Sequence, residues 1–178
     1  HVLLVIPRAS QGLSGAPEKE AFAKLPPVPA ATSDRLASEL SLEMIPAARS
    51  ADFVRFAASV ARYGEFAGNC FATIQNGPYA NESVAAIVRT LQEHGASGVG
   101  QSSWGPLVFA WAESSCAAEE LAEMIRDGLA EEGHDVQVRT NIATGWDVAV
   151  ASATEAEDAV IRAEAIAAEL RQRYDLEN

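Results

Sequence analysis

Residues 98–106 are the part of this 178-residue chain best suited to chemistry. They read Gly-Val-Gly-Gln-Ser-Ser-Trp-Gly-Pro, and an apolar run over residues 107–112 follows. Glycine has no Cβ and tolerates positive φ, so such a loop lets backbone N–H groups approach a ligand. Backbone N–H groups can bind an anion without a basic side chain. The segment therefore predicts either an anion-binding loop or a plain turn between two strands, which the same composition favours.

The candidate ligand-binding residues of this glycine loop are Gly98, Gly100, Gln101, Ser102, Ser103, Trp104 and Gly105. The backbone N–H groups of residues 100–103 and the two serine hydroxyls would donate hydrogen bonds, and the Gln101 amide would donate and accept. Trp104 offers a flat wall for an aromatic ligand or, equally, is a core or interface tryptophan. A second loop over residues 10–15 adds Ser14 and Gly15. It is not a P-loop, because no helix opening with Lys-Ser or Lys-Thr follows it.

The histidines and cysteines give no catalytic or metal-binding pattern. No His-x-x-x-His or Cys-x-x-Cys pair occurs, so no metal site built by the protein alone is expected. The spacing of Ser102, His134 and Asp147 does not support a catalytic triad. Cys70 and Cys116 are predicted to be reduced, partly buried thiols.

Two further polar residues, Asn69 and Gln75, interrupt a largely apolar segment. They cap or bridge helices, or they face a cleft. The residues themselves leave these alternatives open, and no catalytic residue is assigned from the sequence.

The charge of the chain limits its partners. Thirteen Lys and Arg stand against 25 Asp and Glu, for a formal net charge of −12. Nucleic acids and anionic membranes need a basic patch, so we expect neither as a partner. No apolar stretch approaches the roughly 18 residues of a membrane span. The sequence therefore predicts a cytoplasmic protein that acts on small molecules.

The predicted elements begin with a buried strand at 2–6 and helices at 18–24, 33–45, 51–71 and 82–94. Strands at 97–101 and 107–112, a helix at 116–132, strands at 135–140 and 146–151, and a helix at 155–174 follow. This is the split β-α-β order of a ferredoxin-like sheet. We predict an α+β fold with helices mainly on one sheet face, a helical insertion in the first crossover, and an appended strand and helix.

Two local expectations test this prediction. Proline interrupts helices, so Pro46 is predicted to stop the helix at 33–45. Helical periodicity in 116–132 predicts that Leu121, Met124, Ile125 and Leu129 point inward.

Residues 95–106 resemble the C-terminal glycine motif of the GHMP kinase superfamily. They are most similar to its Gly-Gln-Ser-Ser-Trp-Gly-Pro form in beta-ribofuranosylaminobenzene 5′-phosphate synthases. Residues 11–15 with Glu-Ala-Phe at 20–22, and Ser-Asp-Arg-Leu at 33–36, resemble further segments of that family in the same order. The resemblance covers most of residues 1–153.

The resemblance implies that 4-aminobenzoate or 4-hydroxybenzoate condenses with phosphoribosyl pyrophosphate, releasing CO₂ and pyrophosphate, in methanopterin biosynthesis. It implies magnesium bound outside this chain. It also implies a domain over 1–153, a helical extension over 154–178, and an N-terminal phosphate-loop domain that is missing here. We therefore expect the isolated chain to be inactive and to self-associate as a homo-oligomer. The alternatives are an ATP-dependent GHMP kinase, whose loop usually reads Gly-Ser-Gly-Pro, and a non-catalytic ferredoxin-like module.

Overall fold

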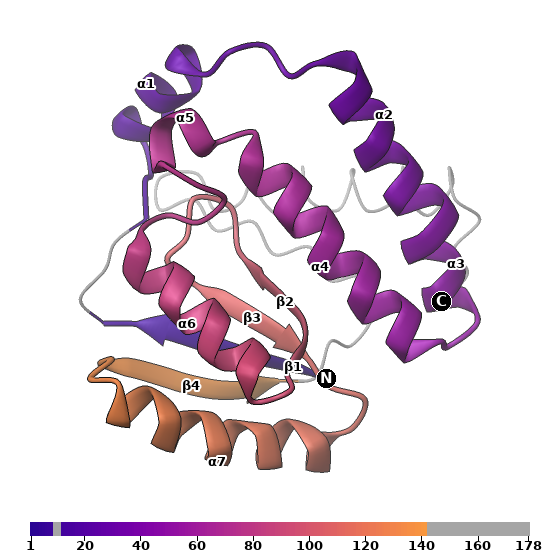
Figure 1. Cartoon of the computed structure of the whole chain (residues 1–178), viewed down its shortest axis with the longest axis vertical. Helices are drawn as coiled ribbons and strands as arrows, with labels where there is room; N and C mark the ends of the chain where they lie inside the picture. The colour runs from indigo at the N-terminus through magenta and orange to yellow at the C-terminus, as the bar shows by residue number, and fades with distance from the viewer. Residues whose placement is uncertain (9–11, 142–178) are drawn as a thin grey trace, which may run out of the picture. The chain divides into compact units, whose positions relative to one another are not determined.

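The computed structural model describes residues 1–8 and 12–141 (Figure 1). Four strands form one antiparallel sheet in the order β2-β3-β1-β4. Their bounds are Val2–Pro7 for β1, Ser97–Gln101 for β2, Val108–Trp111 for β3 and Val136–Asn141 for β4. This order is that of a ferredoxin-like sheet, so the predicted α+β fold is confirmed.

Two amphipathic helices cover one face of the sheet and form the core with it. They are α6 (Glu82–Glu93) and α7 (Ser115–Glu131), and side chains of Asn81 and Ser114 cap their N-termini. The fully buried aliphatic side chains of the core are Leu3, Val5, Val84, Ile87, Val88, Leu91, Val108, Ile125 and Leu129. Burial alternates along β1, so the predicted buried strand has one core face, on which Leu3 and Val5 are fully buried.

The prediction for Met124 is wrong, because half of its side chain is exposed. Ala122 is buried in its place, next to Leu121. Helix α7 packs against β4, α6 and β1. This packing covers a narrow stripe, and Met124 lies at the edge of that stripe.

The first crossover holds the predicted helical insertion, which runs from β1 to α6. It consists of α1 (Ala16–Lys24), α2 (Ala30–Ser38), the π-helix η1 (Glu39–Met44), α3 (Ile45–Arg49), α4 (Phe53–Asn69) and α5 (Ala72–Gln75). Helices α2 and α4 run side by side (Figure 1). The C-terminal residue of α5 is followed by Asn76 in the left-handed conformation.

The helix does not stop at Pro46, contrary to the prediction. Helical structure continues through η1 into α3, and the N–H of Ile45 donates to the carbonyl of Leu40, five residues earlier. Proline leaves the carbonyl four residues before it without a donor. That carbonyl belongs to Leu42, and it accepts a hydrogen bond of 2.8 Å from the Arg55 guanidinium. A tertiary contact thus replaces the missing helical hydrogen bond.

Two ion pairs join η1 to α4, and a cation–π contact joins α2 to α4. Arg62 binds Glu39 at 2.6 Å and Arg55 binds Glu43 at 2.8 Å. The hydrogen bond from Arg55 lowers the pKa of Glu43. The guanidinium of Arg35 lies 3.7 Å from the centre of the Phe66 ring. Partly exposed pairs of this kind orient helices more than they stabilise them.

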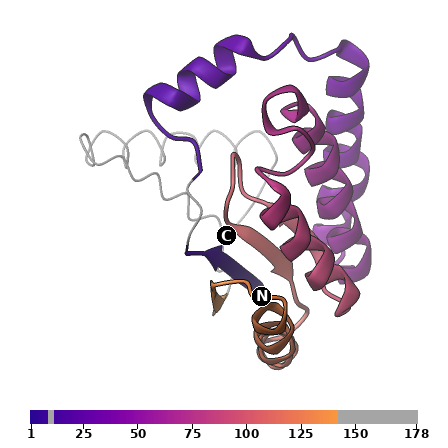
Figure 2. The ribbon, with the colours of Figure 1, turned by 60° about the vertical axis from the view of Figure 1, so that its left-hand side comes forward.

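Helix α4 packs closely on the edge strand β2. A Cβ on Gly98 would lie 3.2 Å from the Cα of Ala57 and 2.9 Å from the Trp111 ring. The Trp111 ring meets the Phe56 ring edge-on, with 5.1 Å between centroids. Helices α4 and α6 lie on the same side of the sheet, as Figure 2 shows. The predicted strand at 146–151, the helix at 155–174 and the boundary at 153 fall outside the described residues.

Among the described helices, none is long and apolar enough to cross a membrane.

Candidate functional site

The topology brings the two predicted loops together at one end of the sheet. Strands β1 and β3 are antiparallel neighbours, with Val5 opposite Val108. The segment that leaves β1 therefore lies beside the segment that enters β3. A Cβ added to Gly12 would collide with the carbonyl oxygen of Gly105. The absence of a side chain at Gly12 lets the second loop pack directly on the glycine loop, a contact that the sequence analysis did not anticipate.

The glycine loop is a locked turn. The N–H of Ser102 donates to the carbonyl of Leu107 at 2.9 Å, and the N–H of Gly105 donates to the carbonyl of Ser102 at 2.8 Å. Ser103 and Gly105 both have positive φ, at 49° and 70°, and the Gly105–Pro106 peptide bond is cis. Two hydrogen bonds and this backbone geometry fix the direction of the tip.

The Gln101 side chain is used within the protein. Its Oε1 accepts a hydrogen bond of 2.6 Å from the N–H of Ala80, and its Nε2 donates to the carbonyl of Ser103 at 2.8 Å. A Cβ on Gly105 would lie 2.8 Å from the Cβ of Ala80. Gln101 therefore ties the glycine loop to the segment that precedes α6. Its amide is satisfied in this arrangement without a ligand.

Trp104 anchors the loop in an aromatic cluster. Its side chain is 3% exposed and meets Phe71 and Phe22 edge-on, at centroid distances of 4.7 Å and 5.2 Å. Of the two alternatives for this residue, the structure has the core tryptophan rather than an open wall for a ligand. Gly98 and Gly100 likewise serve packing, because Cβ atoms there would press on Trp111 and Phe109 respectively.

The groups left for a ligand are at the tip of the turn. Ser102 and Ser103 are exposed. Within residues 1–8 and 12–141, neither serine hydroxyl has a hydrogen-bond partner, and neither do the backbone N–H groups of Ser103 and Trp104. Four donors on a rigid turn can orient a phosphate or a carboxylate. The donor set is thus narrower than the sequence analysis predicted, since the N–H of Ser102 is already bonded.

Ser14 and Gly15 lie at the start of α1. Both are exposed, and Gly15 has a φ of 67° with open space where a Cβ would be. The carbonyl of Gly15 accepts a hydrogen bond from the N–H of Lys19. These two residues start a helix, and their part in ligand binding stays a prediction.

The glycine loop lies inside a recognised family region. Residues 44–131 match the family model described as GHMP kinases C terminal. They form a GHMP kinase C-terminal domain. Strands β1 and β4, which complete its sheet, lie outside the matched residues.

Two proteins of known name are similar to this chain. Beta-ribofuranosylphenol 5′-phosphate synthase from Methanothermobacter thermautotrophicus is 28% identical over 109 residues, which are 61% of this chain and 32% of that protein. The match thus spans about a third of the relative's length. Homoserine kinase from Cytophaga hutchinsonii matches in structure with a TM-score of 0.46 and 14% identity, over 78% of this chain and 40% of that one.

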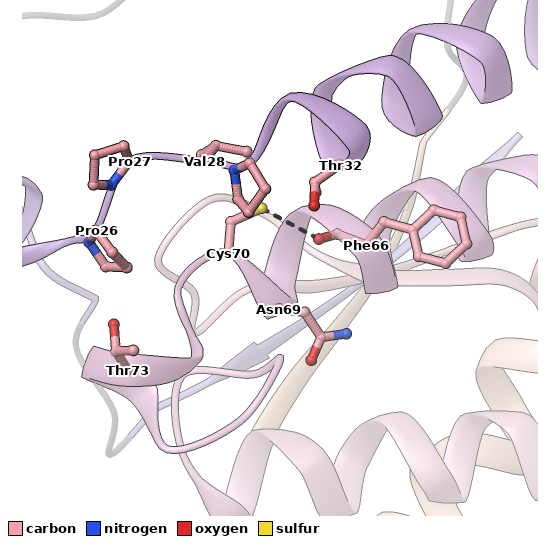
Figure 3. Close-up of a pocket in the computed structure, with 9 residues that line it drawn as sticks. Pro26, Pro27, Val28, Thr32, Phe66, Asn69, Cys70 and Thr73 are labelled. Atoms are coloured by element: carbon pink, nitrogen blue, oxygen red, sulfur yellow. Dashed lines mark hydrogen bonds between the residues drawn. The ribbon is translucent and has the colours of Figure 1, made fainter.

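A pocket of about 250 Å³ lies between the C-terminal end of α4 and the proline-rich segment that joins α1 to α2. Figure 3 shows Pro26, Pro27 and Val28 passing over the C-terminal end of α4. Below them the Cys70 thiol donates to the carbonyl of Phe66 at 3.5 Å. Asn69 donates to its own helix, at the carbonyl of Glu65. Asn69 therefore both bonds along α4 and lines this pocket.

No catalytic triad or metal site forms in the described part of the GHMP kinase C-terminal domain. Ser102 follows β2 and His134 precedes β4, and these strands are the two opposite edges of the sheet. His134 instead lies 3.5 Å from Glu132. Asp147 falls outside the described residues. Among those residues, no three His, Cys, Asp or Glu side chains gather as metal ligands would.

The Cys116 thiol is exposed, so its predicted partial burial is wrong, whereas Cys70 is half-buried as predicted. The thiol of Cys116 donates to Glu120 Oε1 at 3.3 Å, and this hydrogen bond raises the pKa of the thiol.

The thiolate is the nucleophile in alkylation, so the pKa of Cys116 sets the pH at which it is labelled. We expect Glu120→Gln to lower the pKa and to move the pH profile of iodoacetamide labelling at Cys116 to lower pH. Mass spectrometry reads both thiols, and a profile that moves equally at Cys70 would contradict this assignment.

Proposed function

We propose that this domain forms one wall of the active site of a synthase that joins an aromatic acid to phosphoribosyl pyrophosphate. The acid is 4-aminobenzoate or 4-hydroxybenzoate. The bond from the ring to its carboxylate breaks and CO₂ leaves, the ring carbon bonds to C1 of the ribose, and pyrophosphate departs. The observation that carries the proposal is the locked Gln-Ser-Ser-Trp turn with its free donors. The similarity to beta-ribofuranosylphenol 5′-phosphate synthase supports it.

The tip of the turn would bind a single anionic group. Hydroxyls and N–H groups of Ser102 and Ser103 would hold one phosphate or carboxylate, and Ser14 and Gly15 would close the entrance beside them. A polyanion needs more positive charge than a chain of net charge −12 supplies. We therefore propose that most of the pyrophosphate is held by a partner domain that carries the main phosphate loop, in a cytoplasmic homo-oligomer.

Magnesium is the cation that we propose for the pyrophosphate. The described residues do not fit it, since they gather no group of three metal ligands. We place its ligands outside them and derive no step through the metal.

The competing function is an ATP-dependent small-molecule kinase, because the matching family model is named for kinases. The turn sequence favours the synthase, since Gln-Ser-Ser-Trp differs from the Gly-Ser-Gly-Pro usual in kinases.

A turnover assay of the full-length gene product separates these functions. It contains 4-aminobenzoate, phosphoribosyl pyrophosphate and magnesium, with a parallel assay that supplies ATP. Release of CO₂ and pyrophosphate without ATP supports the synthase. Consumption of ATP with no such release rejects the synthase in favour of the kinase, and silence in both assays rejects both enzymes in favour of a binding module.

Within that assay, Ser102→Ala is expected to reduce kcat/KM about 10- to 100-fold, because the donor is lost where a charged group needs it. Stability should change by less than about 0.5 kcal/mol, since the hydroxyl is exposed and unpaired. Ser97→Ala, another exposed serine at the start of β2, is the matched control and should leave kcat/KM unchanged. Equal activity of both variants would remove Ser102 from the site.

A further inference from the structure

A third segment of the domain forms a pocket that the glycine loop does not explain. The pocket measures about 320 Å³ and lies between the end of α5, residues 76–81 and the first two turns of α6. Gln75, Pro78, Tyr79, Glu82 and Arg89 are among its lining residues. The segment 76–81 is joined to the glycine loop by Ala80, whose N–H donates to the side chain of Gln101.

Gln75 carries the strongest indication that something binds here. Both of its amide atoms, Oε1 and Nε2, are buried and have no hydrogen-bond partner. Buried polar groups in folded proteins are almost always paired, and an exception at a pocket indicates a missing partner. Neither amide atom is exposed to the pocket in this structure, so a ligand reaches them only when the Gln75 side chain changes rotamer. An amide offers one donor group and one acceptor side by side.

Arg89 supplies a positive charge at the rim. The side chain is exposed and makes no ion pair within the described part of the chain. The one acidic residue in the lining, Glu82, is seven residues earlier on the same helix, or about 10 Å along the axis. That separation leaves the guanidinium free for an anion. An arginine binds a carboxylate with two parallel hydrogen bonds.

The remaining walls suit a flat ring. Pro78 and Tyr79 also line the pocket. Tyr79 packs against the hydrophobic core, and burial together with the nearby charge of Glu65 raises the pKa of its phenol. The phenol therefore stays neutral at physiological pH and adds no charge to repel an anion.

We propose that this pocket binds the aromatic acid of the proposed reaction, with its carboxylate on Arg89 and its para substituent on the amide of Gln75. The inference rests on the proposed function for the identity of the ring. The oxygen of the amide accepts a hydrogen bond from an amino or from a hydroxyl group. One pocket thus takes both 4-aminobenzoate and 4-hydroxybenzoate and discriminates against benzoate, which leaves Gln75 without a partner.

The test is an NMR titration of the whole 178-residue chain, which needs no turnover. The probes are 4-aminobenzoate, benzoate and the neutral 4-aminobenzamide. We expect 4-aminobenzoate to shift the amide signals of residues 76–81 and the side-chain NH₂ of Gln75, and to bind at least tenfold more tightly than either analogue. Signals that stay unchanged there, or three equal affinities, would overturn the assignment.

Two variants and one matched control complete the test. Arg89→Gln should weaken 4-aminobenzoate at least tenfold and leave 4-aminobenzamide unchanged, whereas Arg126→Gln, an exposed arginine on α7, should change neither. Gln75→Leu should remove the preference for 4-aminobenzoate over benzoate without lowering Tm. A lower Tm would make Gln75 a structural residue and overturn its role in binding.

The outcome separates this inference from the proposed function. Binding at residues 76–81 in a protein that never turns over phosphoribosyl pyrophosphate would reject the synthase and keep the pocket. Normal turnover of 4-aminobenzoate by the Arg89→Gln and Gln75→Leu variants would keep the synthase and reject the pocket.

Discussion

Trp104→Ala is expected to lower the free energy of unfolding by about 3–5 kcal/mol, the usual cost of removing a large buried aromatic ring. The ring is 3% exposed and fills the space between Phe22 and Phe71. Its loss leaves a cavity beneath the glycine loop, which α1 and α5 cannot both close. Urea unfolding followed by circular dichroism measures the change without depending on tryptophan fluorescence.

The control for this experiment is Phe22→Ala. Phe22 belongs to the same cluster but is 50% exposed, so its removal should cost about half as much or less. A loss below about 1 kcal/mol for Trp104→Ala would mean that the ring is not packed in solution. In that case Trp104 would return to the set of residues able to stack on a ligand.

Gly98→Ala is expected to lower the free energy of unfolding by about 2–4 kcal/mol, for two reasons that add. The residue has a φ of 61°, which L-residues with a Cβ rarely adopt. In addition, the new methyl group would lie 2.9 Å from the Trp111 ring and 3.2 Å from the backbone of Ala57. Helix α4 would have to move away from β2, because backbone atoms cannot give way as a flexible side chain can.

Gly95→Ala separates the two contributions. Gly95 also has positive φ, at 79°, but the space around its Cβ position is open. This control should lose about 1–2 kcal/mol from the backbone alone. The difference between the two variants, measured by urea unfolding, is the cost of displacing α4. Equal losses would show that the contact between α4 and β2 is loose.

Local patterns were sufficient to predict most elements of the fold. The helix at 82–94 and the strand at 97–101 are found within one residue of their expected ends, because Asn81, Gly95 and the apolar spacing all act within one turn of the chain. The order of strands and helices then limited the sheet to few arrangements. The predictions for Pro46 and Met124 were wrong. At Pro46 a distant guanidinium overrode the local preference, and at Met124 the narrow coverage of α7 did so.

The candidate site, like the fold, could be predicted from the sequence only in part. The sequence by itself determined where a glycine-rich turn with serine donors lies, since glycine, serine and proline act through their own backbone and side-chain chemistry. It could not determine which donors are free. Only the tertiary structure buries Trp104, bonds Gln101 to Ala80 and leaves the amide of Gln75 unpaired, because each of these depends on residues more than 20 positions away or on the shape of a pocket. Burial and pairing are properties of neighbours in space, and the strand order that supplies those neighbours is decided by the folded sheet.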